Sequence, residues 1–227
     1  MRTIVVSLGG SLIFKGEIDF NYLKKFKELI KKYSKKFKFV IVLGGGKVAR
    51  LYINALAKVG LPKKEQCLIG IRVTRLNAWF MANFFKPLAT QTIPKSLVDV
   101  KHLLAKNNIV FAGALRYKPD NTSDGTAASI ARFLKAEFIN LTNVNGLYSK
   151  DPNKYKDAKF IPEISAKEFY KIASALAYKP GQHFVLDQQA AKIILKYKVK
   201  TVIMNGRNLK NFENYLTNKK FTGTVIF

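Results

Sequence analysis

The segment Gly44-Gly45-Gly46 combines residue types that bind phosphate groups. It follows the apolar stretch 38–43 and opens a pattern typical of a helix. A helix N-terminus offers unpaired backbone N–H groups and the positive end of the helix dipole to an anion. Lys47 and Arg50 add positive charge near the helix start, where a cap without a ligand would favour acidic residues. The spacing is neither that of a Walker A loop nor GxGxxG, but the segment still predicts a phosphate site.

Two further polar turns are candidates for the same chemistry. Gly9-Gly10-Ser11 follows the apolar stretch 3–8, and adjacent glycines allow backbone N–H groups to turn towards an anion. A tight turn without a ligand also needs glycine, so both interpretations stay open for this pair. In the segment 121–126, Thr122 or Ser123 can cap a helix, and the same hydroxyls could hold a second phosphate or a uracil edge.

Other catalytic patterns are weaker. His102 and His183 have no partner at metal-ligand spacing, and no GxSxG string indicates a nucleophilic serine. Asp124, Asp151 and Asp187 stand in loops or at the starts of elements, where a helix cap is a commoner role than binding Mg²⁺ or ribose. The sequence therefore favours phosphate binding over metal or nucleophile chemistry.

The chain of 227 residues is strongly basic, with Lys+Arg 40 against Asp+Glu 14 and a net charge of +26. Clustered charge would favour a nucleic-acid partner, but here the lysines are spread along the chain. They also greatly outnumber the arginines, which are the usual readers of base edges. We interpret the excess as a solvated lysine-rich surface that attracts anionic substrates, and we do not expect a nucleic-acid partner.

The single cysteine, Cys67, allows no internal disulfide and favours a reducing compartment. The N-terminal run MRTIVVSLGG predicts a strand rather than a signal peptide. No apolar stretch approaches the roughly 20 residues of a membrane-spanning helix. We therefore expect a soluble, cytoplasmic protein with no membrane partner.

Predicted strands and helices alternate along the whole chain. Strands are expected at 3–8, 38–43, 89–93, 108–112, 137–142, 200–204 and 222–226. Helices are expected after Asp19, which can cap the first of them, through Tyr33, from Gly46 to Lys58, and at 65–85, 97–105, 124–135, 166–174, 187–197 and 208–217. Such alternation predicts an α/β fold with one mostly parallel sheet, shared by both halves of the chain, and helices on both faces. We expect a single domain, 1–227, whose two halves are residues 1–135 and residues 136–227.

Six segments together resemble the amino-acid-kinase superfamily and, within it, the archaeal branch of UMP kinases. They are VVSLGGSL (5–12), VLGGGKVAR (42–50), IGIRVTRLNA (69–78), SDGTAA (123–128), LTNVNGLYSKDP (141–152) and LDQQAAKII (186–194). They occur in the family's order, near its spacing, over almost the whole chain. The resemblance implies a three-layer α/β/α sandwich in which residues 1–135 hold UMP and residues 136–227 hold ATP.

The reaction implied by the resemblance moves the γ-phosphoryl group of ATP to UMP and yields UDP, a step of pyrimidine nucleotide biosynthesis. Mg²⁺ would arrive bound to the ATP phosphates, with no protein side chain as a metal ligand. Such kinases assemble as homo-oligomers, typically hexamers built from dimers. Positioning and charge neutralisation supply most of the catalysis in phosphoryl transfer.

The resemblance also assigns site residues by position. Gly9, Gly10 and Ser11 would face the transferred phosphate, and Lys192 is a candidate electrostatic helper in catalysis. The expected ATP contacts are Gly9, Gly10, Gly46, Arg50, Thr142, Tyr148 and Asp151, with the Tyr148 ring beside the adenine. The expected UMP contacts are Gly45, Cys67, Gly113, Arg116, Thr122 and Ser123, with the loop 113–123 wrapped around UMP.

Several positions depart from the family pattern. Ser7 stands where many superfamily members have lysine, Cys67 stands where an acidic residue is expected to bind the UMP ribose, and Asn145 replaces the usual aspartate. These departures leave two alternatives open. The chain could be another small-molecule kinase of the same fold, or a non-catalytic relative that binds nucleotides or RNA.

The loop 113–121 is longer and more basic than the family's usual loop. Its alignment with the family pattern is open for that reason. Arg116 or Lys118 is the candidate contact to the acceptor phosphate.

Overall fold

A computed structural model of the chain describes residues 1–117, 122–175 and 186–227. Lys118 and His183 lie outside the described residues, and so do the roles considered for them above. Within the described ranges, no helix combines the length and the apolar character needed to cross a membrane.

The main sheet of the described residues has seven strands in the order β3-β2-β1-β4-β8-β9-β7. The strands are β1 (Arg2–Leu8), β2 (Phe37–Leu43), β3 (Ile109–Ala112), β4 (Glu137–Thr142), β7 (Glu163–Ile164), β8 (Thr201–Asn205) and β9 (Thr224–Ile226). All neighbouring pairs are parallel except β8 and β9. β1 and β2 are nearly continuous apolar runs, as expected for strands buried on both faces. The prediction of one mostly parallel sheet shared by both halves is confirmed.

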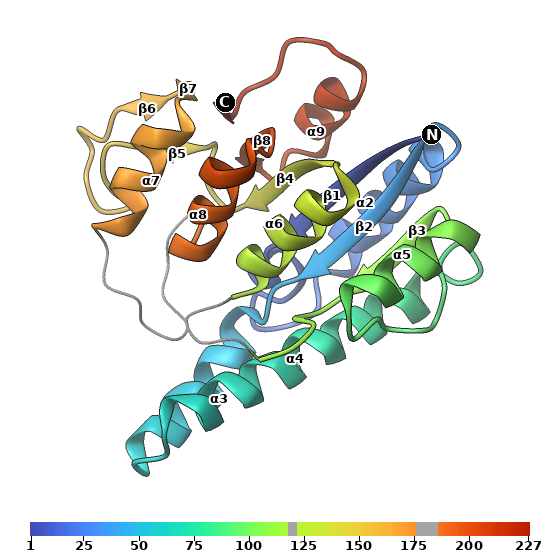
Figure 1. The fold of residues 1–227 in the computed structure, drawn as a ribbon, viewed down its shortest axis with the longest axis horizontal. Coiled ribbons are helices and arrows are strands. Elements are labelled where there is room, and N and C mark those ends of the chain that lie inside the picture. The colour runs from blue at the N-terminus through green and yellow to red at the C-terminus, as the bar shows by residue number, and fades with distance from the viewer. Residues whose placement is uncertain (118–121, 176–185) are drawn as a thin grey trace.

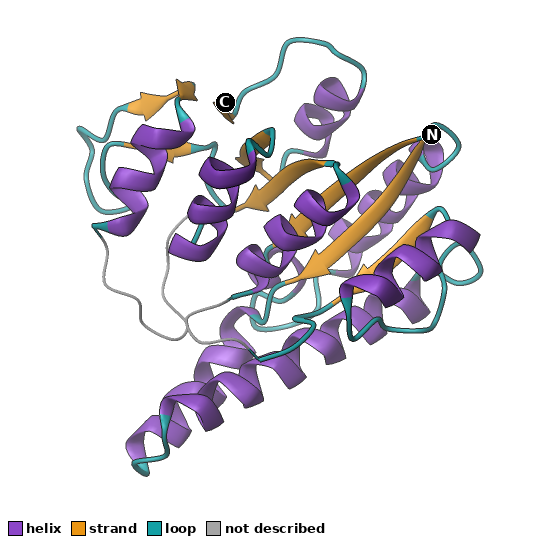
Figure 2. Ribbon diagram, viewed as in Figure 1, coloured by secondary structure: helices purple, strands orange, loops and turns teal. Residues whose placement is uncertain are grey.

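Helices cover both faces of this sheet (Figures 1 and 2). One face carries α2 (Phe20–Tyr33), α4 (Lys63–Phe84) and α9 (Leu209–Leu216). The other face carries α5 (Leu97–Lys106), α6 (Ser123–Leu134), α7 (Ala166–Ser174) and α8 (Gln188–Tyr197). Successive side chains of β1 alternate between the two cores, because Ile4, Val6 and Leu8 lie in the first and Val5 lies in the second. The result is the expected three-layer α/β/α sandwich.

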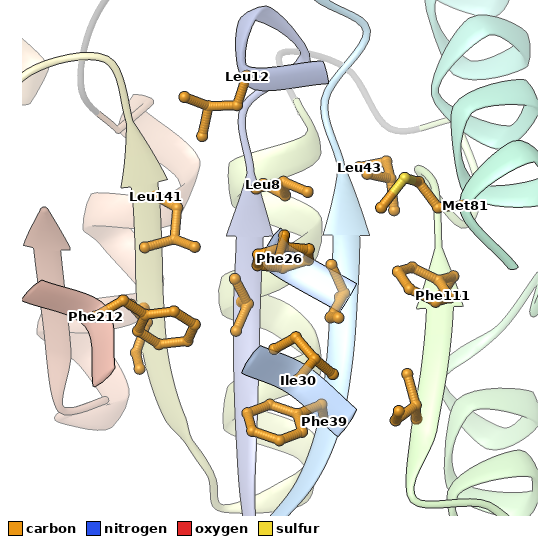
Figure 3. Close-up of a cluster of buried hydrophobic side chains, with 14 of the residues drawn as sticks. Leu8, Leu12, Phe26, Ile30, Phe39, Leu43, Met81, Phe111, Leu141 and Phe212 are labelled. Atoms are coloured by element: carbon orange, nitrogen blue, oxygen red, sulfur yellow. The ribbon is translucent and has the colours of Figure 1, made fainter. Parts of the chain in front are cut away.

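The first core, on the α2, α4 and α9 face, is rich in aromatic side chains (Figure 3). Phe26 of α2, Phe39 of β2, Phe111 of β3 and Phe212 of α9 are fully buried there. Full burial of a large apolar side chain stabilises the fold by roughly 1.5–3 kcal/mol. This core fixes the strands whose carboxyl ends carry the glycine turns.

α3 (Gly46–Lys58) and the first half of α4 extend beyond the sheet as a two-helix projection, the α3–α4 pair (Figure 1). Ala49, Ile53 and Val73 form a small separate core between the two helices. The second half of α4 returns to the sheet, where Ala78 and Met81 join the first core. α4 therefore connects the projection with the sheet.

The prediction of a strand at 89–93 is wrong, because this segment is a loop. It joins α4 on one face to α5 on the other, so it passes the sheet edge formed by β3. Ala89 and Ile93 pack against the first core, and the Gln91 side chain donates to the carbonyl oxygens of Ala82 and Ala89. The apolar residues that indicate a strand here serve packing instead.

The other predicted elements are present, with ends within two residues of those expected. Four further elements were not predicted. They are α1 (Gly10–Ile13), β5 (Leu147–Tyr148), β6 (Phe160–Ile161) and β7 (Glu163–Ile164). Each is too short to show a periodic pattern in the sequence.

Candidate active site

The turns that follow β1 and β2 are in direct backbone contact. A Cβ atom on Gly10 would lie 2.4 Å from the Gly46 nitrogen and 2.8 Å from the Gly44 carbonyl oxygen. Gly46 has a φ of +61°, a conformation that favours glycine. The Gly44 N–H donates to the Leu8 carbonyl oxygen (2.9 Å), which ties the second turn to the end of β1. Two of the three candidate phosphate turns therefore form one continuous backbone surface.

Two helices begin at these turns without a side-chain cap. Gly9 is the N-cap of α1 and Gly45 is the N-cap of α3, and neither has a side chain that could accept the first N–H groups. Uncapped N–H groups at a helix start are available to an anion. Lys47 is exposed on the first turn of α3, whereas Arg50 is half-buried and burial lowers its pKa. This set of donors is suited to a chain of phosphate groups.

The third turn reaches the same end of β1 through α6 and α8. Thr122 is the N-cap of α6 and accepts from the Asp124 N–H (3.1 Å), which confirms its capping interpretation. The Ser7 hydroxyl at the end of β1 donates to Asp124 Oδ1 (2.6 Å). Asp187 is the N-cap of α8, as the capping interpretation expected, and it also accepts from the Gly125 N–H (3.1 Å) and from the Thr122 hydroxyl. All three polar turns therefore lie together.

Asp124 and Asp187 form a pair of carboxyl groups at this junction. Burial, together with the charge of Asp187, raises the pKa of Asp124 to about 7, although the Ser7 hydrogen bond acts in the opposite direction. Burial also raises the pKa of Asp187, against the hydrogen bonds that it accepts. The capping interpretation of Asp124 is wrong, because its carboxylate binds Ser7 and faces a second carboxylate. Such a pair favours a nearby positive charge.

The loop after β3, here called the acceptor loop, is described over residues 113–117, and its first residues are docked on α4 by backbone and side-chain contacts. A Cβ atom on Gly113 would lie 2.6 Å from the Arg75 nitrogen, so the loop backbone packs directly on the helix backbone. The Ala114 N–H donates to Thr74 Oγ1 (2.9 Å). The Arg75 guanidinium donates to the carbonyl oxygens of Ala114 (Nε, 3.0 Å) and Leu115. Thr74 and Arg75 therefore hold the backbone expected to contact UMP.

Neither Thr74 nor Arg75 is among the site residues expected from the sequence. Both lie in the segment IGIRVTRLNA, whose polar residues were a usable signal. Asn77 in the same segment donates from Nδ2 to the Gly44 carbonyl oxygen (2.8 Å). α4 therefore positions one of the glycine turns as well as the acceptor loop.

Three residues of the second half of the chain are expected to bind ATP, and the first of them lies next to the first glycine turn. The Gly9 N–H donates to the Leu141 carbonyl oxygen (3.1 Å), so Thr142 at the end of β4 borders the first glycine turn. Tyr148 lies on β5, where its ring packs edge-on against Phe160 with 5.4 Å between the centroids. Asp151 accepts from the Asn153 N–H (2.9 Å) in the following loop.

The remaining expected residues differ in exposure. Ser11 and Cys67 are half-buried, in α1 and α4 respectively. Ser123 opens α6 and is half-buried. Arg116 is exposed just beyond the docked segment of the acceptor loop. Lys192 is exposed on α8, between one and two turns after its cap.

The described residues contain no group of three or more His, Cys, Asp and Glu side chains arranged to hold a metal ion. The polar turns, by contrast, meet at the carboxyl ends of parallel strands, where open α/β sheets bind their ligands. Fold and site together define an α/β sandwich protein built to bind phosphorylated ligands.

Comparison with known proteins makes this class specific. The model of the amino acid kinase family matches residues 2–205, and the chain belongs to that family. It is 34% identical over 224 residues to the uridylate kinase of Methanobrevibacter smithii, with 98% of each chain covered. It is 35% identical over 227 residues to the uridylate kinase of Thermoplasma volcanium, covering 99% of this chain and 97% of that one. The crystal structure of uridylate kinase from Archaeoglobus fulgidus superimposes with a TM-score of 0.85, at 33% identity and complete coverage of both chains.

Proposed function

We propose that this protein transfers the γ-phosphoryl group of ATP to UMP and forms ADP and UDP. One observation carries the proposal: the contact between Gly10 and Gly46 brings two uncapped helix starts together, and a chain of phosphates fits such a surface. The full-length similarity to the uridylate kinases of M. smithii and T. volcanium supports UMP as the acceptor. The reaction would belong to pyrimidine nucleotide biosynthesis in the cytoplasm.

On the donor side, the backbone binds the phosphates of ATP. The N–H groups at Gly10, Ser11 and Gly46 face the phosphates, and Arg50 neutralises some of their charge. Gly9 borders the phosphates, but its N–H donates to the Leu141 carbonyl oxygen. Transfer of a phosphoryl group gains most from positioning and from stabilising charge on the moving group, so no protein nucleophile is required. The adenine lies towards Thr142, Tyr148 and Asp151, because the end of β4 borders the first glycine turn. Lys192 would contribute positive charge to the catalytic site from a greater distance.

Mg²⁺ would be held by the ATP phosphates and would supply neutralisation of their negative charge. Asp124 and Asp187 fit such a complex, because a positive charge beside them would favour their ionised forms and reverse the effect of burial on their pKa values. Asp187 is already engaged as the α8 cap. Asp124 is therefore the carboxylate that would interact with the ion, while the phosphates of ATP bind it directly.

On the acceptor side, UMP contacts the start of α3 and the acceptor loop. Gly45 and Gly113 border it, Thr122 and Ser123 close the loop, and the exposed Arg116 is free to approach the acceptor phosphate. Thr74 and Arg75 keep the loop in place from behind. At the ribose position Cys67 offers a thiol instead of a carboxylate.

The protein acts as a homo-oligomer, a hexamer built from dimers, that uses the α3–α4 pair as an interface. Large apolar side chains are exposed on this pair and on the adjoining second half of α4: Leu51 is 59% and Tyr52 52% exposed on α3, and Leu76 is 61% and Trp79 56% exposed further along α4. Exposed large apolar side chains on neighbouring helices mark an interaction surface. A second copy of the same pair, packed side by side, would bury them.

A coupled assay of ADP release with UMP, CMP, AMP and dTMP in Mg²⁺ buffer tests the proposal. The expected result is turnover with UMP at the highest kcat/KM of the four. If ATP stabilises the protein against heat, while UMP neither stabilises it nor is turned over, another small-molecule kinase would be favoured instead. Absence of turnover with all four acceptors, combined with salt-sensitive RNA binding, would favour a non-catalytic role.

A further inference from the structure

A cavity lined mainly by polar and charged residues lies beside the end of β8, whose Asn205 pairs with Thr142 of β4. It has a volume of about 680 Å³ and lies between the starts of α2 and α9, near the end of β8. This volume is within the range of small-molecule sites, roughly 300–1,000 Å³. None of the residues expected to bind ATP or UMP lines it.

The wall of the cavity is positively charged. Lys15, Lys25 and Arg207 line it, and Asp19 is the one acidic residue among the lining side chains of the described structure. Lys15 and Lys25 are exposed and make no ion pair with a described residue. Arg207 directs one donor to Asp19 (2.6 Å), and the charge of Lys15 also acts on this carboxylate, so three basic side chains share one acidic residue.

Helix geometry adds to this preference for an anion. Asp19 is the N-cap of α2 and Asn208 is the N-cap of α9, so both helix starts open on the cavity. The positive dipole ends of two helices then act together. Asn21, in the first turn of α2, is exposed in the same wall and offers an amide donor.

One residue of the lining, Tyr22, carries a buried polar atom without a partner among the described residues. Tyr22 is 7% exposed, and the atom is its hydroxyl oxygen. A buried hydroxyl without a partner costs free energy, so such groups in native proteins call for an unseen partner. The Arg207 guanidinium lies 5.0 Å from the centroid of the same ring.

Arg207 connects this cavity to the candidate active site. Its Nη2 donates to the Ser11 carbonyl oxygen (2.7 Å), on the turn expected to face the transferred phosphate. Asn205, also in the wall, donates to Asn145 Oδ1 (3.1 Å) in the loop after β4. An anion that attracts Arg207 would therefore compete with the Asp19 and Ser11 contacts.

We propose that this cavity binds a small phosphate-bearing anion through Lys15, Lys25 and Arg207, and that the bound anion alters ATP binding through the contact between Arg207 and Ser11. The cavity shares no lining residue with the proposed donor and acceptor sites, although its Asn205 pairs with Thr142 of the donor site. The proposed binding of the anion does not depend on the proposed function, whereas its effect on ATP binding rests on that function.

Calorimetric titration with inorganic phosphate, pyrophosphate and ribose 5-phosphate, at constant ionic strength and with ADP and UMP saturating, tests the binding step. The double variant Lys15→Gln/Lys25→Gln leaves the Arg207 contacts intact. The control Lys24→Gln/Lys31→Gln removes the same charge from exposed positions of α2 that do not line the cavity. This control matters because a protein of net charge +26 attracts any anion.

The wild type should bind at least one of the three probes with a stoichiometry of one. The cavity variant should weaken that binding at least about tenfold, as expected for the loss of two charged contacts, while the control stays within about twofold. The tightest probe shows whether the site prefers a free phosphate or a sugar phosphate. Equal weakening in both variants, or no binding with the active site filled, would overturn the proposal.

The coupling is measured as the effect of the bound probe on the KM for ATP. The probe should change this KM in the wild type and in the control, and should leave it unchanged in the cavity variant. An identical change in all three proteins would place the probe in the active site and refute the coupling. A protein without kinase activity would fail this second test alone, so the two failures are distinguishable.

Discussion

The Ser7 hydroxyl in β1 donates a hydrogen bond of 2.6 Å to Oδ1 of Asp124 in α6. This contact joins residues 117 positions apart in the sequence and places an aspartate at the end of the strand that leads into the first glycine turn. The bond favours the ionised form of Asp124, against burial and against the charge of Asp187. Ser7 therefore tunes a carboxyl group whose pKa lies close to neutral pH.

Ser7→Ala should move the acidic limb of the kcat profile to higher pH. Loss of the donor removes a hydrogen bond that lowers the Asp124 pKa, so a higher pH is needed to ionise the carboxyl group. The measurement is kcat between pH 5 and 9. Ser129→Ala is the matched control, because it removes a hydroxyl of α6 that donates to the Gly125 carbonyl oxygen (2.7 Å) instead of to a carboxylate. Coincident profiles for wild type and Ser7→Ala would contradict this role.

Asp124→Asn should stabilise the ligand-free protein at pH 8 while lowering kcat at least about tenfold. The folded-state pKa of about 7 lies above the ordinary value of 3.8, so ionisation opposes folding as pH rises between these values. Below 3.8 both states are protonated and the cost is absent; above 7 it is fully present. Thermal unfolding should show a rise of about 2–4 °C per kcal/mol gained at pH 8, and a smaller rise at pH 4.5. An equal rise at both pH values would contradict the argument.

Gly10→Ala should abolish most activity without unfolding the protein. The new Cβ atom would lie 2.4 Å from the Gly46 nitrogen, so the two turns must separate by more than an ångström. A misplacement of this size costs about 100-fold in rate. The measurement is kcat/KM for ATP, with circular dichroism as the check on folding. Gly70→Ala is the control, since its Cβ atom would meet only the flexible end of Ile53 on the α3–α4 pair.

Arg75→Lys should raise the KM for UMP about tenfold and leave the KM for ATP nearly unchanged. A lysine ammonium cannot reproduce the paired donation of the guanidinium to Ala114 and Leu115, so the acceptor loop keeps its Thr74 contact on α4 but loses the contacts to Arg75. Initial rates with each substrate varied in turn separate the two constants. Arg72→Lys, an exposed position on the same helix, should change neither. An equal rise in both KM values would show a general loss of structure instead.

Leu76→Glu combined with Trp79→Glu should reduce the size of the particle in solution. Both side chains are more than half exposed on α4, and charge at their positions opposes the packing of a second copy. Light scattering after gel filtration gives the mass. A wild type that runs as a monomer of 25.6 kDa would contradict the proposed oligomer.

Much of the fold was predictable because the pattern is local. Continuous apolar runs predicted β1 and β2 as buried strands, and 3.6-residue spacing predicted α2. The glycines of both turns were recognisable for the same reason, since the need for glycine arises where the chain turns. The segment 89–93 shows the limit of this reasoning: its apolar residues serve packing at a sheet edge, which a local pattern cannot distinguish from a strand.

The site was less predictable, because its polar contacts join distant segments of the chain. Nothing near Asp124 in the sequence indicates Ser7, and nothing near Ala114 indicates Arg75. The carboxyl pair of Asp124 and Asp187 likewise exists only once α6 and α8 start at the same strand end. Contacts of this kind depend on strand order, which periodicity does not specify.

Phosphoryl transfer itself is tested most directly by following label from γ-³²P-labelled ATP to UMP with the purified protein in Mg²⁺ buffer. We predict that label appears in UDP, and that Gly10→Ala reduces the rate about 100-fold. Label that stays in ATP, or that appears in free phosphate whether or not UMP is present, would contradict the proposed kinase activity.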